Sequence, residues 1–293
     1  MIKFNTDFDL EVKLVNNDIT YVSSKHKLFN VNLKEIWQYR DLILLFVKRD
    51  LTTSYKQTIL GPLWILINPL LSTTVFTVIF GIIAGIPTDG TPQFLFYMSG
   101  NILWGFFSSC LNRGSGTFLG NVRLFGKVYF PRLVMPISGI IYNLVNFFLQ
   151  TSVFVILVIV YAVIGANVHP NWLIALTPLL VLQTAMLGTG MGLIISSITT
   201  KYRDLNVLVG FGVSLLMYIT PVVYPISQVP VNFRWLMLLN PVAPIVETYR
   251  CAFLGRGSFE WPFLLISLAV TAGLLFWGVV VFNKVEKNFI DTV

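Results

Sequence analysis

The sequence predicts an all-α integral membrane protein, and three observations carry that prediction. Hydrophobic residues make up 55% of the chain, charged residues make up 11%, and the mean hydropathy is +0.76. A soluble domain carries roughly 25% charged residues, so lipid must solvate this much apolar surface. The segment 133–200 contains no Asp, Glu, Lys or Arg, and the polar stretch 165–171 divides it. Each half exceeds the ~20 residues that a helix needs to cross a bilayer, which predicts two spanning helices joined by a short loop.

Residues 1–32 are polar and mixed in charge, and they form the predicted extramembrane N-terminal tail. Apolar and charged residues alternate from Phe8 to Leu14, and Asn16-Asn17-Asp18 is a turn signal, so this stretch predicts a small β-hairpin. We expect a packing flap rather than a ligand-binding module. The start lacks the basic and apolar regions of a cleaved signal peptide.

Residues 33–59 form the next predicted element, an amphipathic helix. Asn32 and Glu35 resemble a capping box, and apolar residues recur at helical spacing from Leu33 to about Gln57. Charged residues interrupt this pattern too often for a spanning helix. An amphipathic helix with a basic face belongs in the headgroup region, with or without a protein partner.

Six spanning helices are predicted within residues 60–283, followed by a short tail at 284–293. Five prolines cut residues 221–260 into pieces that are too short to cross a membrane and too apolar for a free loop. Short re-entrant helices that dip back into the membrane fit that stretch. The predicted spans are roughly 60–86, 93–110, 133–164, 172–198, 205–220 and 261–282, with a kink expected at Pro69.

The orientation follows from the Lys and Arg residues. Of the 20, 17 lie at one set of span ends, while Arg234, Arg250 and Arg256 lie in the stretch 221–260. By the positive-inside rule, both termini are cytoplasmic and residues 221–260 face outward. An even number of spans is required for this orientation, in agreement with six.

The charged residues argue against several classes of function. The acidic residues between Asp50 and Glu286 all fall outside the middle of the spans, whereas a proton- or sodium-driven transporter usually holds an ionisable group there. The glycine-rich stretch 114–120 lacks the Gly-Lys-Ser/Thr of a phosphate-binding loop. No enzyme motif, metal site or cofactor site is expected, and the basic charge of +7 is assigned to the membrane surface rather than to nucleic acid. Cys110 and Cys251 lack metal or redox spacing, and free buried thiols are favoured over a disulfide.

Polar residues inside the spans mark a candidate substrate path. Asn143, Asn146 and Gln150 share one face of the third span, and Asn68 and Ser72 share a face of the first. Such amides either bond neighbouring helices or line a wet path for a hydroxyl-rich cargo, and the sequence leaves both readings open. Four aromatic residues, Phe106, Phe107, Tyr218 and Tyr224, are candidates for stacking on sugar rings, with core packing as the default. Thr184, Gly188, Gly192 and Ser196 form a small-residue stripe that predicts close helix packing.

Four motifs occur in order between residues 33 and 290. They are Arg49-Asp50 with Tyr55-Lys56-Gln57-Thr58 and Leu60-Gly61-Pro62-Leu63-Trp64; Asn121-Val122-Arg123-Leu124 with Lys127 and Phe130-Pro131-Arg132; Lys201-Tyr202-Arg203-Asp204-Leu205 with Thr220-Pro221-Val222-Val223-Tyr224-Pro225; and Asn240-Pro241-Val242-Ala243-Pro244 with Glu247 and Arg250. Together they resemble the polysaccharide-exporting ABC-transporter permeases of the type-2 class. The tail 1–32 is longer than this family leads one to expect.

The resemblance implies a homodimer joined by two copies of an ATP-hydrolysing subunit on a separate chain, which would bind the ATP. It implies export of a lipid-linked O-antigen, capsule or teichoic-acid-type polymer across the bacterial cytoplasmic (inner) membrane. The family's interface helix maps to 33–59, its coupling helix to about 117–129, and its outer gate helices to 221–255. The residues expected at the ATPase contact are Arg49, Lys56, Asn121, Arg123 and Lys127, and those expected at the outer gate are Glu247 and Arg250, a pair spaced i and i+3.

Two other functions stay open from the sequence. A small-lipid or drug exporter permease of the same superfamily would share the fold. A membrane-embedded enzyme acting on lipid-linked sugars would need paired carboxylates or a metal-binding acid at a membrane face, and the sequence offers no convincing pair.

Overall fold

The computed structural model describes residues 10–13, 19–22, 33–56, 60–128, 130–202, 204–257 and 259–292. These residues are mainly helical, and two short strands, β1 (Leu10–Lys13) and β2 (Ile19–Val22), pair antiparallel with Leu10 opposite Val22. The turn predicted between the strands lies outside the described residues, as do 57–59, Tyr129 and Arg203.

Five helical stretches among the described residues are long and apolar enough to cross a membrane. The first is composite, because a 3₁₀ turn, an α-helix containing Pro69 and a π-helix follow one another without a break. The spanning stretches are η1–α3–η2 (Gly61–Leu63, Trp64–Phe76, Thr77–Ile83), α4 (Gln93–Ser115), α6 (Val134–Val163), η3–α7 (Trp172–Leu176, Thr177–Thr199) and α11 (Trp261–Thr292).

The predicted fifth span, 205–220, has the expected bounds but is too short to cross a bilayer as a helix alone. It corresponds to α8 (Leu205–Ile219), which has 15 residues and is therefore about 22 Å long, against a hydrocarbon core of ~30 Å. Thr220 leaves the helix with φ −82° and ψ 142° because it precedes Pro221, whose ring disfavours helical geometry at the preceding residue.

Helices α4 and α7 form the centre of the bundle. Most of each helix is buried, whereas α3, α6 and α11 expose broad apolar faces. The small-residue stripe on α7 allows this close approach, because a Cβ on Gly192 would lie 2.6 Å from the carbonyl oxygen of Leu111 on α4. The packing role predicted for this stripe is confirmed at Gly188 and Gly192.

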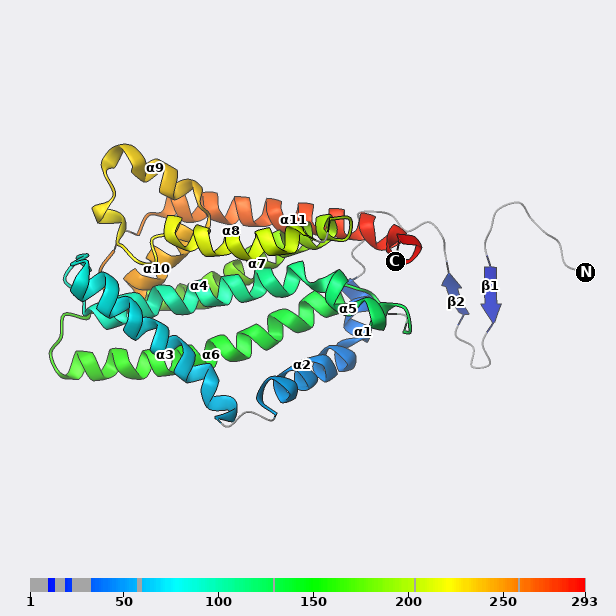
Figure 1. The fold of residues 1–293 in the computed structure, drawn as a ribbon, viewed down its shortest axis with the longest axis horizontal. Helices are drawn as coiled ribbons and strands as arrows, with labels where there is room; N and C mark the ends of the chain where they lie inside the picture. The colour runs from blue at the N-terminus through cyan, green and yellow to red at the C-terminus, as the bar shows by residue number, and fades with distance from the viewer. Residues whose placement is uncertain are drawn as a thin grey trace, which may run out of the picture.

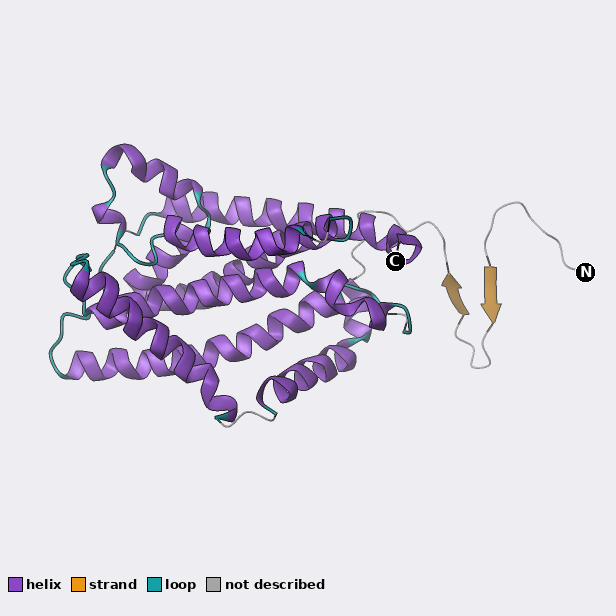
Figure 2. Cartoon of the chain, in the orientation of Figure 1, coloured by secondary structure: helices purple, strands orange, loops and turns teal. Residues whose placement is uncertain are grey.

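The bundle has two different ends, which we call the α5 end and the α10 end (Figure 1). The short helices α1 (Leu33–Gln38) and α5 (Thr117–Phe125) lie at the α5 end, together with the start of α2 (Arg40–Tyr55). The opposite end holds α9 (Val231–Leu239), α10 (Val242–Leu254) and the connections between α3 and α4 and between α6 and α7. Figure 2 shows that most of the loops gather at these two ends.

The segment predicted as one amphipathic helix is divided at Tyr39 into α1 and α2. Ile43 and Phe46 of α2 pack into an apolar cluster at the α5 end, together with Phe118 and Phe125 of α5. The opposite side of α2 leaves Leu44 and Leu45 exposed. This helix therefore connects α5 to the long helices and still presents apolar surface outward.

Candidate functional site

A polar groove lies between α3, α4 and α6, with a volume of about 330 Å³. Five of the seven residues predicted for the substrate path line it, although they come from two helices that are distant in sequence. None of the described residues that line this groove carries a charge. Its polar lining residues are Asn68, Ser72, Asn101, Ser109, Tyr142, Asn143, Asn146 and Gln150.

Hydrogen bonds between the helices fix part of this lining. The amide of Asn101 on α4 donates to Ser72 Oγ at 2.7 Å, and the amide of Gln150 on α6 donates to the carbonyl oxygen of Ile65 at 3.3 Å. The buried amide of Asn143 lies 3.6 Å from Cys110 Sγ on α4. The predicted amides Asn143 and Gln150 therefore bond neighbouring helices and line the groove at the same time.

Aromatic rings complete the groove. Trp64 lies near the N-terminal end of α3, and Phe106 and Phe147 pack together with their ring centroids 4.8 Å apart. Aromatic side chains beside amides and hydroxyls suit a ligand that is apolar on its ring faces and rich in hydroxyls at its edges. Both phenylalanines predicted for stacking belong to the buried core, since Phe106 borders the groove but is only 4% exposed and Phe107 is fully buried.

Tyr218 and Tyr224 lie outside the polar groove. Tyr218 is exposed on α8, and Tyr224 lines a separate open groove of mainly apolar residues, such as Ile86 and Phe233. The hydroxyl of Tyr224 donates to the carbonyl oxygen of Tyr218 at 3.1 Å. Burial raises the pKa of Tyr224, so its hydroxyl stays neutral and able to donate.

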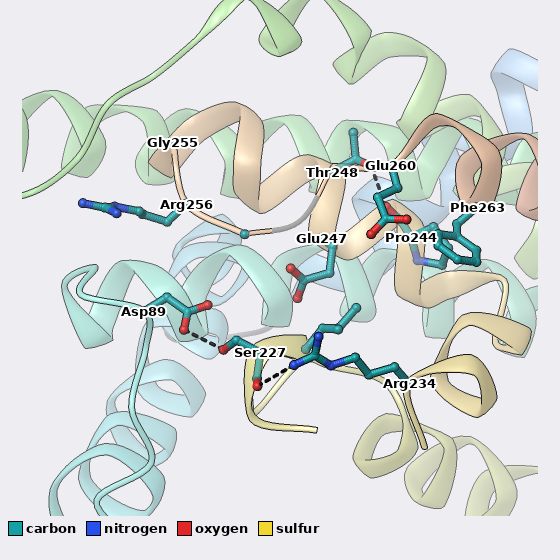
Figure 3. Close-up of a pocket in the computed structure, with 12 residues that line it drawn as sticks. Asp89, Ser227, Arg234, Pro244, Glu247, Thr248, Gly255, Arg256, Glu260 and Phe263 are labelled. Carbon is teal, nitrogen blue, oxygen red and sulfur yellow. Dashed lines mark hydrogen bonds between the residues drawn. The ribbon is translucent and has the colours of Figure 1, made fainter. Parts of the chain in front are cut away.

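A larger cavity of about 510 Å³ opens at the α10 end (Figure 3). Its lining includes three carboxylates, Asp89, Glu247 and Glu260, and the guanidinium of Arg234. Ser227 holds part of this wall together, since its hydroxyl donates to Asp89 and its carbonyl oxygen accepts from Arg234 (Figure 3). In the part of the chain that the structure describes, no three His, Cys, Asp or Glu side chains are placed to hold a metal ion.

The predicted pair of Glu247 and Arg250 is present on α10. The Arg250 Nη1 donates to Glu247 Oε1 at 2.8 Å, and both side chains are only 2% exposed. The guanidinium also stacks on the ring of Phe96 at 3.7 Å and donates to the carbonyl oxygen of Val222 at 3.2 Å. These contacts fix α10 against α4 and against the chain that follows α8.

Four of the five residues predicted for the ATPase contact lie on α5, beside it or in the turn after it, whereas Lys56 lies at the far end of α2. Arg49 and Asn121 line a cavity of about 220 Å³, which we call the α5-end cavity, whereas Arg123, Lys127 and Lys56 are exposed. Arg49 is paired with its neighbour Asp50, at 2.8 Å. The structure therefore places the exposed cations of α5 and of the following turn on an outer surface.

Sequence reasoning missed three residues at these sites. Asn101 reaches Ser72 across 29 residues, and Arg113 reaches Asp50 across 63. Tyr142 lines the polar groove from α6. A usable signal was present for Asn101 and Tyr142, because each is a polar residue within an otherwise apolar span.

Long apolar helices around an uncharged polar groove define this chain, by class, as a multi-pass membrane transport protein. Residues 41–254 match the family described as ABC-2 type transporter, which is most of the chain. The chain belongs to that family.

Three relatives illustrate the similarity. The O-antigen export system permease protein RfbA of Myxococcus xanthus is 29% identical over 264 residues, or 89% of this chain and 98% of that protein. The protein of the same description from Klebsiella pneumoniae is 28% identical over 86% of this chain and 94% of its own length. The polysialic acid transport protein KpsM of Escherichia coli is 27% identical over 83% of this chain and 93% of its own length.

Proposed function

We propose that this chain is the membrane-spanning permease subunit of an ATP-driven exporter of lipid-linked polysaccharide. The cargo is O-antigen or a similar polymer, and the membrane is the bacterial cytoplasmic one. The observation that carries this proposal is the polar groove, whose neutral amides, hydroxyls and aromatic rings match the chemistry of a sugar chain. The names of the RfbA and KpsM relatives support a polysaccharide cargo.

The proposal includes the orientation and the assembly. The α5 end faces the cytoplasm, together with both termini, and the α10 end faces outward. Helix α8, with the extended residues that follow it, acts as a sixth crossing, and α9 and α10 are re-entrant helices of the outer gate. Two copies of the chain form a homodimer within the lipid bilayer.

Energy is supplied by two copies of an ATPase subunit that bind the ATP and dock on the cytoplasmic side. Exposed Arg123 and Lys127, on α5 and in the turn after it, provide the contact, together with α2. This arrangement agrees with the distribution of the charges, because the acidic residues between Asp50 and Glu286 avoid the middle of the spans and offer no proton-driven alternative. The chain itself is then a transport subunit and not an enzyme.

One observation favours a second candidate, a permease for small lipids or drugs. The groove beside Tyr224 has a volume of about 600 Å³ and is lined mainly by apolar residues, including Ile86 and Phe233. An apolar molecule would fit this groove better than a sugar would.

The experiment that separates the candidates removes the chain from cells that make a surface polysaccharide. Polymer export predicts loss of the surface polymer and accumulation of its lipid-linked form in the cytoplasmic membrane. A stoichiometric P-loop ATPase should also copurify with the tagged chain in mild detergent. Normal surface polymer in the depleted cells, or reproducible absence of an ATPase from the intact permease, would contradict the proposal.

A further inference from the structure

A second cavity continues the polar groove along the same two helices. On α4, Gly105 and Ser109 line the polar groove, and Arg113, one turn further on, lines the α5-end cavity. On α6, Asn143 lines the polar groove and Gly139, one turn earlier, lines the α5-end cavity. Both cavities therefore follow the seam between α4 and α6, and a single layer of side chains divides them.

Arg113 and Tyr142 form this dividing layer. The guanidinium carbon of Arg113 lies 3.7 Å from the centroid of the Tyr142 ring, which is a close cation–π contact. Gly139 leaves room for the arginine, because a Cβ there would lie 3.3 Å from Arg113 Cδ. Tyr142 faces the polar groove and Arg113 faces the α5-end cavity.

Helix α2 holds both members of this layer. Arg113 Nη1 donates to Asp50 Oδ2 at 2.7 Å, and the hydroxyls of Tyr142 and Ser54 share a hydrogen bond of 2.9 Å. Asp50 and Ser54 are four residues apart, so they lie on the same face of α2, one turn apart. One helix therefore contacts the arginine and the tyrosine at the same time.

The strength of these contacts suits a layer that opens and closes. The side chain of Arg113 is 33% exposed and that of Asp50 is 18% exposed, so neither charge is locked into a dry core. Separating such a pair lets water solvate both groups, which costs far less than leaving a buried charge without a partner. A displacement of α2 would withdraw Asp50 and Ser54 together.

We propose that Arg113 and Tyr142 form a gate between the α5-end cavity and the polar groove, and that α2 holds this gate shut through Asp50 and Ser54. The inference rests on the proposed function, in which the ATPase acts on α2 and the cargo enters from the α5 end. Movement of α2 away from α4 and α6 frees the guanidinium and the phenol. The two cavities then join into one path.

The test measures access to the polar groove directly. An Asn146→Cys reporter is introduced into the full chain, which is coexpressed with its ATPase partner, and inside-out membrane vesicles expose the α5 end. A membrane-impermeant methanethiosulfonate reagent is added without nucleotide, and the labelling rate is measured. The chain without the reporter gives the background, because its own Cys110 is buried and Cys251 lies near the α10 end.

We expect Arg113→Ala to raise the labelling rate about tenfold, since the variant loses the cation–π contact and the ion pair together. Tyr142→Phe keeps the ring and loses the bond to Ser54, so a smaller rise of about threefold is expected. Arg113→Lys retains the charge and should stay within about twofold of the parent rate. The matched control is Lys284→Ala, which removes an exposed cation of α11 outside the proposed ATPase contact and should leave the rate unchanged.

Equal labelling rates for Arg113→Ala and Lys284→Ala would overturn the gate and leave Arg113 as a packing residue. If Arg113→Ala does not accumulate in the membrane, the labelling rates of Asp50→Asn and Tyr142→Phe test the gate in its place. Both should exceed the parent rate, and rates equal to the parent would overturn the gate. Adding ATP and magnesium should raise the rate in the parent and add little in Arg113→Ala. Because labelling needs no cargo, absence of polysaccharide export by the parent chain would refute the proposed function and leave the gate to be judged on access alone.

Discussion

Glu247 and Arg250 form a buried ion pair one helical turn apart on α10, with Arg250 Nη1 2.8 Å from Glu247 Oε1. The pair is not isolated, because the same guanidinium stacks on Phe96 of α4 and donates to the carbonyl oxygen of Val222. Three segments that are far apart in the chain therefore meet at one arginine. Removal of either charge leaves the other charge buried without its partner.

The first prediction concerns this pair. Glu247→Arg should destabilise the folded chain by about 3 to 5 kcal/mol, because two cations would then face each other without water. The double exchange of Glu247→Arg with Arg250→Glu should restore export only in part, since a carboxylate cannot replace the guanidinium on Phe96 or at the Val222 carbonyl. Thermal unfolding in detergent and export of polymer measure the two effects. Equal defects in the single and double variants would count against pairing, and Glu260→Gln, at an exposed carboxylate of the same end, is the control.

The second prediction concerns the exposed cations of α5 and the turn after it. Replacing Arg123 and Lys127 together with Glu should uncouple ATP hydrolysis from export, because the charge reversal weakens the proposed ATPase contact. The membrane dimer should still form, since both side chains are exposed and none of the described contacts between the long helices depends on them. ATPase activity and export are measured on the same purified complex. Lys284→Glu changes an exposed cation of α11 and should leave both activities intact, whereas normal export by the Arg123 and Lys127 variant would refute the assignment.

The third prediction concerns the contact between the two central helices. Gly192→Ala should destabilise the chain by about 1 to 3 kcal/mol, because the new Cβ would meet the Leu111 carbonyl oxygen and backbone rarely yields in a packed core. A Cβ there would lie 2.6 Å from that oxygen. Gly212→Ala is the matched control, since its Cβ would have no atom within 4 Å. Equal melting temperatures for the two variants would show that α4 and α7 can separate without cost.

The positions of five spans could be predicted from the sequence because absence of charge over some 20 residues is a local property. The polar face of α6 could be predicted for the same reason, since Asn143, Asn146 and Gln150 recur at helical spacing. Contacts between residues that are distant in the chain could not be predicted from the sequence, and the ion pair between Asp50 and Arg113 is the clearest case. Each residue alone looks like a surface charge, and only the fold brings them together.

The length of α8 illustrates a different limit. The predicted bounds of 205–220 agree with the helix to within one residue, but 15 helical residues are fewer than the ~20 that a crossing needs. The structure ends the helix at Ile219 because Pro221 imposes an extended conformation on the residue before it. Tyr218 and Tyr224 were assigned to the path by residue type, but Tyr218 lies on α8 and Tyr224 in the chain after it, and neither lines the groove that α3, α4 and α6 enclose.

The last prediction tests the polar groove as the path of the cargo. Gln150→Leu keeps most of the side-chain volume and removes the amide that faces the groove and donates to the Ile65 carbonyl oxygen. A sugar chain would lose hydrogen-bond partners that a leucine cannot replace. If transport loses the free energy of one such hydrogen bond, the export rate should fall about tenfold. The matched control is Ser152→Leu, which places the same side chain two residues away on an exposed face of α6 and should leave export unchanged. Melting temperatures of both variants separate a loss of packing from a loss of cargo contact. Unaltered export by a stable Gln150→Leu variant would place the path elsewhere, and the apolar groove beside Tyr224 would become the stronger candidate.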